Sequence, residues 1–234
     1  MKIALCFSGQ ARSVEKGYEY YKKNLLDHYD VDVFFHTWKV DDVVSKMVDL
    51  YKPVRYSYAP LLQLDVDRKY TNTPNAQKYP PRFTYSMFFS MNKCRELMTY
   101  YSTTEEMEYD WVIRSRTDYA LNVKIPFEDL TNDMLYIPNC RMVPTRDFGN
   151  DQFAFSSQRN MDKYMSTFLN LDNYYHAGTS FIGENLMRAN LHEHNLFGPK
   201  LQYVNMNNPF PPGPHNGTWH SLIRDDYDKW TKAS

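Results

Sequence analysis

The segment DWVIRSRTDYAL (110–121) passes from bulky apolar residues to charged ones within a few positions. Its apolar start is typical of a buried strand. Arg114, Arg116 and Asp118 then occupy alternate positions, so on an extended chain they share one face, roughly 6–7 Å apart. Arginine binds phosphate oxygens bidentately, and a carboxylate together with phosphates can hold Mg²⁺ or Mn²⁺. The segment therefore predicts a site for a phosphate-bearing ligand and a divalent cation; a structural arginine–aspartate pair is the alternative.

A second candidate binding segment, SGQARS, follows the apolar run KIALCF (2–7). Ser8, Gly9 and Gln10 could form hydrogen bonds with a nucleotide, and Arg12 could contact a diphosphate. Ordinary turn chemistry explains the same residue types equally well.

Two carboxylates are candidate general bases. Asp151 precedes a predicted strand, and Glu184 follows a glycine at the start of a predicted helix. Either side chain could deprotonate the hydroxyl group of an acceptor. A carboxylate at the start of a helix is also a common cap, so a structural role is the alternative for both.

The histidines offer few metal ligands. His36 ends an apolar run and is interpreted as a core residue. His192 and His194 cannot face the same side of a helix, so they make a poor metal pair. His215 and His220 lie in an Asn- and Pro-rich stretch, where a lone histidine such as His215 could close over a metal.

The first quarter of the chain predicts the elements that would position these residues. Short apolar runs indicate strands over 2–7, 31–38 and 54–59, and apolar residues at helical spacing indicate helices over 14–29 and 41–51. This β-α-β-α-β order predicts a largely parallel sheet with right-handed connections. Ligands bind beyond the carboxyl ends of such strands, so the polar segments that follow them should meet at one edge.

The rest of the chain continues the alternation of helices and strands. A helix over 83–101 leads into the strand of segment 110–121, and Ser156 or Ser157 should cap a later helix. Segments 60–82 and 205–220 are rich in turn-forming residues and are predicted to be loops. The further elements expected are a short helix or turn and then a strand in 127–138, a strand over 150–157, and helices over 158–171 and 180–196.

Length and composition limit the function classes. A chain of 234 residues favours one domain, and a net charge of −1 argues against general attraction to nucleic acid or an anionic membrane. Its 20 tyrosines and 14 phenylalanines could line a sugar site or fill the core. Three scattered cysteines favour a reducing cytoplasm. No apolar run approaches about 18 residues, so no transmembrane segment is expected, and membrane association would depend on a partner or a lipid-linked substrate.

Several common motifs are absent from the sequence. There is no GxxxxGK(S/T), no GxGxxG and no GxSxG. Their absence argues against P-loop enzymes, nicotinamide-dependent enzymes and serine hydrolases.

The ordered set IALCFSGQAR, DVDVFFHTW, YDWVIRSRTDYAL and NDQFAFSS resembles GT-A-type glycosyltransferases. These include enzymes of large algal viruses and of bacterial polysaccharide and lipopolysaccharide synthesis. The resemblance implies a single α/β domain with a GT-A-like, Rossmann-like, mostly parallel central sheet flanked by helices over 1–204. Its nucleotide-binding part would be about 1–122 and its acceptor part about 123–204, with 205–234 as an irregular tail packed on the domain. For a viral protein the location would be the host cytoplasm.

The family's signature is an Asp-x-Asp motif that holds Mn²⁺ or Mg²⁺ against the donor's diphosphate. The triplet RTD at 116–118 falls at that place, with Asp118 matching the second aspartate, the usual metal ligand. Arg116 replaces the first aspartate, and an arginine there could take over part of the charge neutralisation. The resemblance also matches 8–12 to the nucleotide-contacting loop and Asp151 to the region that supplies acceptor contacts or the base.

The sequence therefore predicts a cytoplasmic hexosyl- or deoxyhexosyltransferase that uses a UDP- or dTDP-sugar and a glycan or lipid-linked acceptor. The metal, Arg116 and Arg12 would stabilise charge on the leaving diphosphate. Asp151 or Glu184 would activate the acceptor in an inverting reaction, whereas a retaining enzyme needs no such base. A sugar-phosphate nucleotidyltransferase, which normally has a Gly-rich loop after its first strand, and a non-catalytic glycan-binding module are the alternatives.

Overall fold

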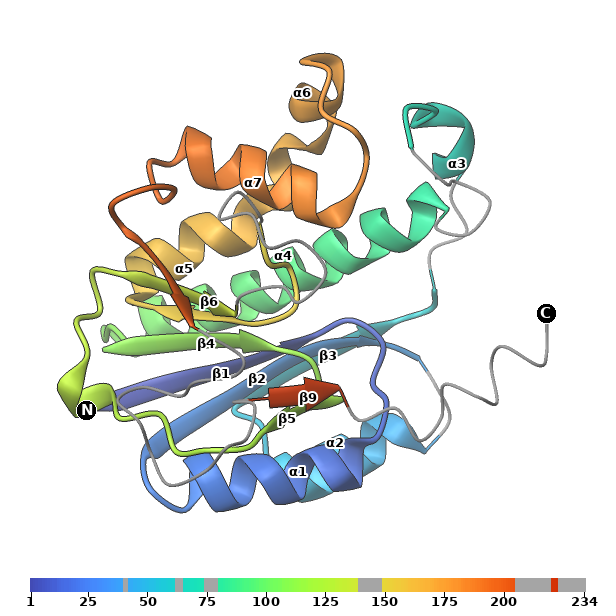
Figure 1. Ribbon diagram of the computed structural model, residues 1–234. Helices are drawn as coiled ribbons and strands as arrows, with labels where there is room; N and C mark the ends of the chain where they lie inside the picture. The colour runs from blue at the N-terminus through green and yellow to red at the C-terminus, as the bar shows by residue number, and fades with distance from the viewer. Residues whose placement is uncertain (40–41, 62–64, 74–79, 139–148, 205–219, 223–234) are drawn as a thin grey trace.

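The computed structural model describes residues 1–39, 42–61, 65–73, 80–138, 149–204 and 220–222. These residues form a central mixed sheet of seven strands with helices on both faces (Figure 1). In spatial order the strands are β3 (Arg55–Ala59), β2 (Asp30–Trp38), β1 (Lys2–Ser8), β4 (Trp111–Ser115), β7 (Ala154–Ser156), β6 (Leu135–Pro138) and β8 (Leu201–Val204).

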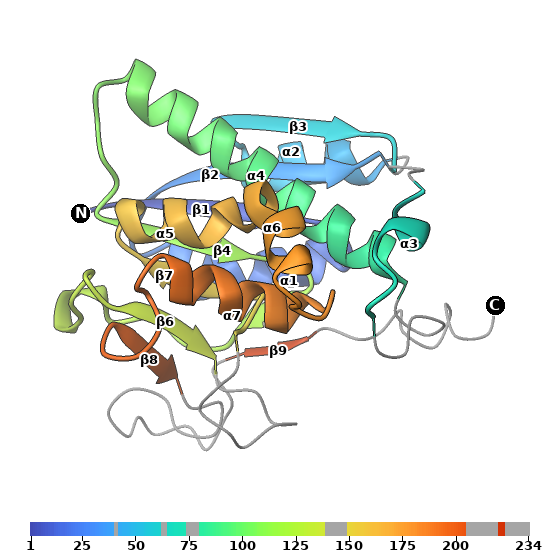
Figure 2. The ribbon, with the colours of Figure 1, turned by 90° about the horizontal axis from the view of Figure 1, so that it is seen from above.

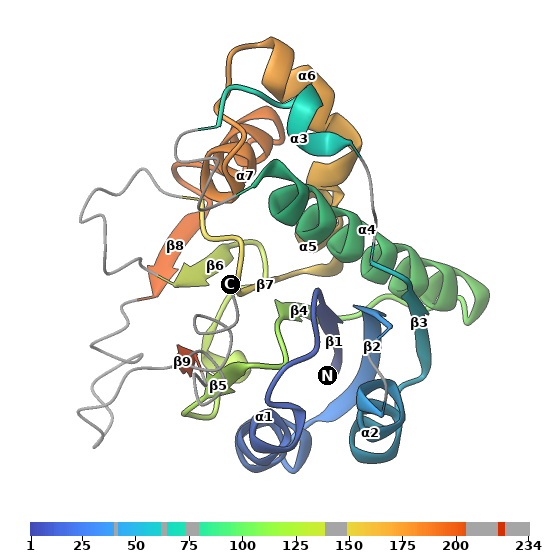
Figure 3. The same cartoon turned by 90° about the vertical axis from the view of Figure 1, so that its right-hand side faces the viewer.

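Strands β3, β2, β1 and β4 are parallel, as the β-α-β-α-β pattern predicts. In the register of β1, Ser8 lies opposite His36 of β2, and Phe7 lies opposite Ser115 of β4. The carboxyl ends of these strands therefore meet at one edge, which faces the viewer in Figure 3. The order of the strands reverses direction between β1 and β4, and such a switch point opens a crevice for ligands.

The other half of the sheet contains antiparallel pairs. Strand β7 runs antiparallel to β4, with Ala154 opposite Arg114, and β6 runs antiparallel to β7 but parallel to β8. Because β7 is antiparallel, the segment that enters it begins at the edge where β4 ends. This reversal brings Asp151 to the carboxyl edge of the parallel strands.

Helices α1 (Val14–Tyr21) and α2 (Val43–Tyr51) cover one face of the sheet (Figures 1 and 3). The other face carries α4 (Pro81–Thr104), α5 (Gln158–Met165) and α7 (Gly183–Glu193), as Figure 2 shows from above. No helix in the described part of the chain has the length and apolar character needed to cross a membrane. The shorter helical segments are η1 (Lys22–Leu26), α3 (Val66–Lys69), η2 (Phe127–Asp129), η3 (Ser166–Asn170) and α6 (Leu171–His176).

Two apolar layers bury the sheet from both sides. On one face Cys6 and Val112 pack in a cluster with Phe88 of α4, and on the other Leu5 packs in a cluster with Tyr21 of α1. Strands covered on both faces have near-continuous apolar sequences. This double burial explains why the central strands are recognisable in the sequence.

Some predicted boundaries differ from the structure. The helix predicted over 14–29 ends with the π-helical segment η1 at Leu26, and the loop predicted over 60–82 contains α3 and the start of α4. Ser157 caps α5, since its Oγ accepts a hydrogen bond from the N–H of Asn160 at 3.4 Å.

The carboxyl-terminal segment is not wholly irregular, contrary to the prediction for 205–234. Strand β9 (His220–Leu222) pairs antiparallel with β5 (Tyr119–Leu121), which directly follows the charged segment after β4. A three-residue strand is too short to show a hydrophobic period, which is why the sequence does not predict β9. The remainder of that tail, including His215, lies outside the described residues, and the division at 122 and 204 stays a prediction.

Gly17 offers a test of how α1 packs on the segment after β4. A Cβ added at Gly17 would lie 2.0 Å from the backbone oxygen of Thr117. We expect Gly17→Ala to lower the free energy of unfolding by about 1–3 kcal/mol because the two backbones must separate. Helix propensity alone predicts the opposite sign, a gain of roughly 1 kcal/mol.

Chemical denaturation of Gly17→Ala beside Glu19→Ala, an exposed position on the same helix, checks this expectation. A Gly17→Ala protein as stable as the wild type would show that the helix and the Thr117 backbone are not in contact.

Candidate functional site

The loop after β1 is held in place by hydroxyl groups of its neighbours. Ser90 Oγ of α4 accepts a hydrogen bond from the N–H of Gly9 at 2.7 Å, and Thr37 Oγ1 of β2 accepts one from the N–H of Ala11 at 3.2 Å. Gly9 has a φ of 102°, a left-handed conformation that favours glycine. The two hydrogen bonds fix the loop over the carboxyl ends of β1 and β2.

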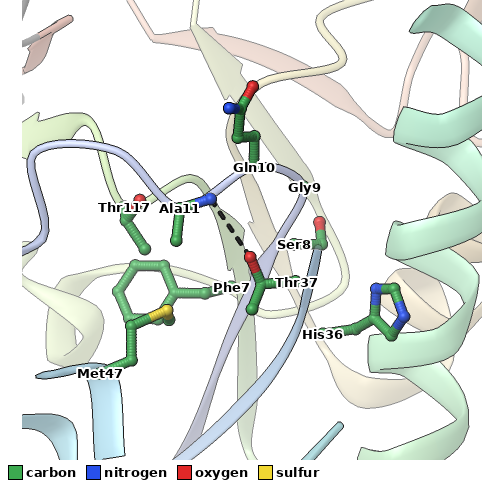
Figure 4. Close-up of a pocket in the computed structure, with 9 residues that line it drawn as sticks. All are labelled: Phe7, Ser8, Gly9, Gln10, Ala11, His36, Thr37, Met47 and Thr117. Atoms are coloured by element: carbon green, nitrogen blue, oxygen red, sulfur yellow. Dashed lines mark hydrogen bonds between the residues drawn. The ribbon is translucent and has the colours of Figure 1, made fainter. Parts of the chain in front are cut away.

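The same loop is joined to the turn after β4. Thr117 Oγ1 accepts from the N–H of Arg12 at 2.9 Å and donates to the carbonyl oxygen of Arg12 at 2.8 Å. A narrow pocket opens between the two segments (Figure 4). It is lined by Phe7, Ser8, Gly9, Gln10, Ala11, His36, Thr37, Met47 and Thr117.

The side chains of Gln10 and Arg12 are the accessible polar groups of this loop. Arg12 is exposed, and its Nη2 donates a hydrogen bond to Gln10 Oε1 at 2.7 Å. Because backbone N–H groups of Gly9, Ala11 and Arg12 already have protein acceptors, a ligand would meet these two side chains. Ser8, predicted to touch the nucleotide, is buried.

Arg114 is fully buried, unlike the ligand-contacting residue that the sequence predicts. Its Nε donates to Ser8 Oγ at 3.2 Å, and its Nη1 donates to the backbone oxygen of Asp151. Among the described residues no group accepts a hydrogen bond from Nη2. The guanidinium lies beneath the carboxyl edge because β4 directs alternate side chains to the α4 face, where Ser8 also lies. Arg114 thus stabilises the site through its hydrogen bonds to Ser8 and Asp151.

Arg116 and Asp118 form a bidentate ion pair. Arg116 Nε donates to Asp118 Oδ1 at 2.8 Å, and Arg116 Nη2 donates to Asp118 Oδ2 at 2.6 Å. The prediction of an extended chain from Arg114 to Asp118 is therefore wrong. Strand β4 ends at Ser115, and the N–H of Tyr119 bonds to the oxygen of Arg116 at 3.2 Å, which closes a turn. The turn brings the guanidinium back onto the carboxylate.

Asp151 lies on a locally fixed turn at the same edge. Asn150 Oδ1 accepts from the N–H groups of Gln152 at 2.8 Å and Phe153 at 3.1 Å. Helix α7 begins against Asp151, because a Cβ on Gly183 would lie 2.2 Å from Asp151 Oδ2. Gly183, the residue before Glu184, therefore allows the carboxylate of Asp151 to pack closely against the helix.

The two predicted bases, Asp151 and Glu184, interact electrostatically. Burial raises the pKa of Asp151, while the positive charges of Arg114 and Arg116 act to lower it. Burial also raises the pKa of Glu184, and the negative charge of Asp151 raises it further. The structure thus brings both carboxylates and both arginines into one electrostatic cluster.

His36 is a core residue, as the sequence predicts. It is buried, and its Nδ1 lies 2.8 Å from Ser90 Oγ. Ser90 Oγ donates its own proton to the oxygen of His36 at 3.0 Å, so Nδ1 carries the proton in their shared bond. Burial, aided by the positive charge of Lys93, lowers the pKa of His36 to about 4.

The groups around Asp118 do not fit a divalent cation as they are arranged. Both carboxylate oxygens already accept hydrogen bonds from Arg116. The described residues contain no group of three or more His, Cys, Asp or Glu that could hold a metal ion. Mn²⁺ or Mg²⁺ at Asp118 stays a prediction, and the other proposed ligand, His215, lies outside the described residues.

Glu184→Gln tests the electrostatics of the carboxylate pair. The raised pKa means that ionisation of Glu184 is less favourable in the folded state, so stability falls as the pH rises through that pKa. We expect Glu184→Gln to unfold a few degrees higher than the wild type at about pH 7.5. Near pH 4, about the unperturbed pKa of glutamate, the gain should disappear.

Thermal unfolding at the two pH values checks this expectation, with Glu19→Gln, on the exposed face of α1, as the matched control. A midpoint that falls equally at both pH values would contradict the proposed repulsion between Glu184 and Asp151.

Comparisons with known proteins agree with this architecture. Among solved structures, that of an active-site mutant of LgtC, a GT-A glycosyltransferase, is similar with a TM-score of 0.52 and 10% sequence identity. The similarity covers 89% of this chain and 74% of the LgtC chain. Likeness at this identity supports the fold alone, which is GT-A-like, as the sequence predicts.

The sequence itself matches one family model. No curated protein matches it, but the model described as "Domain of unknown function (DUF7796)" matches residues 1–196. That match covers most of the 234 residues, so the chain belongs to the DUF7796 family.

Proposed function

We propose that this protein is a glycosyltransferase that moves a sugar from a nucleotide-sugar donor to a hydroxyl group of an acceptor. The observation that carries the proposal is the cluster of Arg116, Arg114, Asp151 and Glu184 at the switch point of the sheet. Open α/β sheets bind ligands at this place. The GT-A-like fold supports the same class of reaction.

The donor is proposed to be a UDP- or dTDP-sugar, with its diphosphate over the carboxyl ends of β1 and β4. Arg116 is about a quarter exposed and Arg12 is exposed, so both guanidinium groups can reach an anion in solution. Negative charge grows on the diphosphate as its bond to the sugar breaks. Fixed guanidinium groups lower the energy of that state, because their donors match pairs of phosphate oxygens.

The acceptor, proposed to be a glycan or a lipid-linked sugar, would be activated by the carboxylate pair. Glu184 is partly exposed at the start of α7, whereas Asp151 is 8% exposed. We assign contact with the acceptor hydroxyl to Glu184, whose pKa is raised by burial and further raised by the negative charge of Asp151. A base is most effective when its pKa lies near the working pH. This assignment belongs to an inverting reaction in the cytoplasm.

Nucleotide binding is the first test. Calorimetric titration with UDP, dTDP, GDP, ADP and CDP, each with EDTA and with Mn²⁺, should reveal binding of at least one of them. Arg12→Ala should weaken that binding about tenfold, the effect of losing one charged contact. Absence of binding in every titration would overturn the proposed function.

Arg159→Ala provides the matched control for Arg12→Ala. Arg159 is an exposed arginine near the amino end of β4, since the neighbouring Gln158 accepts a hydrogen bond from the N–H of Tyr109 at 2.8 Å. Its loss removes one positive charge at the opposite end of the sheet and should leave binding unchanged.

The roles of the two carboxylates can be separated by kinetics. With a donor identified by a hydrolysis screen of nucleotide sugars, Glu184→Gln should lower kcat by about 10²–10⁴-fold, the usual contribution of a general base. Asp151→Asn should keep more activity and shift the acidic limb of the pH–rate profile to lower pH, because it removes the charge that raises the pKa of Glu184.

An unchanged kcat in Glu184→Gln would overturn the assignment of the base, and an unchanged acidic limb in Asp151→Asn would overturn the role of Asp151. Release of pyrophosphate from a nucleoside triphosphate and a sugar phosphate would instead identify a nucleotidyltransferase.

A further inference from the structure

The turn after β4 holds the guanidinium of Arg116 in one orientation. Asp118 accepts from two of its nitrogens, Nε and Nη2, at 2.8 and 2.6 Å. Thr117, between the two residues, is tied to both backbone groups of Arg12, and its carbonyl packs against Gly17 of α1. Two parallel bonds and an anchored backbone leave the planar group little freedom.

Arg116 keeps donors for a ligand while it remains bound to Asp118. A guanidinium has five N–H donors, and the pair with Asp118 uses two of them. The other three are one N–H on Nη2 and two on Nη1, and no described residue is a hydrogen-bond acceptor for Nη1. The side chain is 26% exposed, whereas that of Asp118 is 7% exposed. The arginine is therefore the more accessible member of the pair.

A divalent cation at Asp118 would be opposed by the positive charge of Arg116. Each carboxylate oxygen accepts one hydrogen bond from Arg116 and keeps a further lone pair, but a cation bound there would lie close to the guanidinium unless the ion pair opened. The described part of the chain provides no cluster of three acidic or histidine side chains to compensate. Asp118 is thus placed to orient an arginine, which does not require a metal.

We infer that Arg116, oriented by Asp118, binds the diphosphate of the donor directly and takes the place that a bridging divalent cation would occupy. The inference rests on the proposed function, and it identifies the positive charge that would neutralise the donor's diphosphate. Asp118 is then a positioning residue. The diphosphate is met by Nη1 and Nη2 of Arg116 and by the exposed guanidinium of Arg12.

Titration of the full-length protein with the nucleoside diphosphate that binds it tests the inference. The dissociation constant should agree within about twofold in EDTA, Mg²⁺ and Mn²⁺, because no contact depends on the metal. Arg116→Lys, which keeps the charge but loses the planar fork, should bind at least about tenfold more weakly in all three buffers.

Two further variants separate a positioning aspartate from a metal ligand. Asp118→Asn keeps one acceptor oxygen for Arg116 and should weaken binding only about three- to tenfold, equally with and without metal. Arg116→Asp creates a pair of carboxylates at 116 and 118. This variant should not bind the nucleotide in EDTA and should bind it in part with Mn²⁺. Thermal unfolding confirms that each variant is folded.

Wild-type binding that is lost in EDTA and restored by Mn²⁺ would overturn the inference and leave the proposed function intact. The inference would also be overturned if Mn²⁺ strengthened nucleotide binding by the wild type but not by Asp118→Asn. If no nucleoside diphosphate binds in any buffer, the proposed function fails, and the inference fails with it.

Discussion

The candidate site depends on one buried charge, the guanidinium of Arg114 on the central strand β4. A buried charge is costly unless polar groups and an opposite charge surround it. Here the compensation comes from Ser8 at the end of β1 and from Asp151 in the segment before β7, through its backbone oxygen and its carboxylate. The guanidinium therefore links the ends of β1 and β4 to the segment before β7, although its Nη2 has no acceptor among the described residues.

The remaining features of the edge follow from how the neighbouring segments are fixed. The turn after β4 pairs Arg116 with Asp118, and Thr117 joins it to the loop after β1. On the other side, α7 approaches Asp151 closely through Gly183 and places Glu184 beside a negative charge. The result is one cluster in which positive groups come from β4 and the turn after it, and acidic groups with raised pKa values lie beside α7. For the proposed reaction, such a cluster offers positive groups for a departing anion and carboxylates that could accept a proton.

The central strands, the helices around them and the edge that carries the charges could be predicted from the sequence, because double burial leaves near-continuous apolar runs that end in polar segments. The backbone conformation after β4 could not be predicted, since a turn at 116–118 and a strand at 119–121 have no hydrophobic period. Arg114 was predicted to meet a ligand because alternate residues were taken to share one face of an extended chain; its burial depends on β7 and Ser8, which are distant in sequence. His36 was correctly predicted to be a core residue, but its partner Ser90 could not be predicted, because only the packing of α4 brings that side chain to the ring.

The most direct test of this account is a crystal structure of the protein soaked with the nucleoside diphosphate that titration identifies. We predict that the diphosphate lies between the carboxyl ends of β1 and β4, with an oxygen about 3 Å from a guanidinium nitrogen of Arg116. A nucleotide bound elsewhere on the molecule, or one whose phosphates do not contact Arg116, would contradict it.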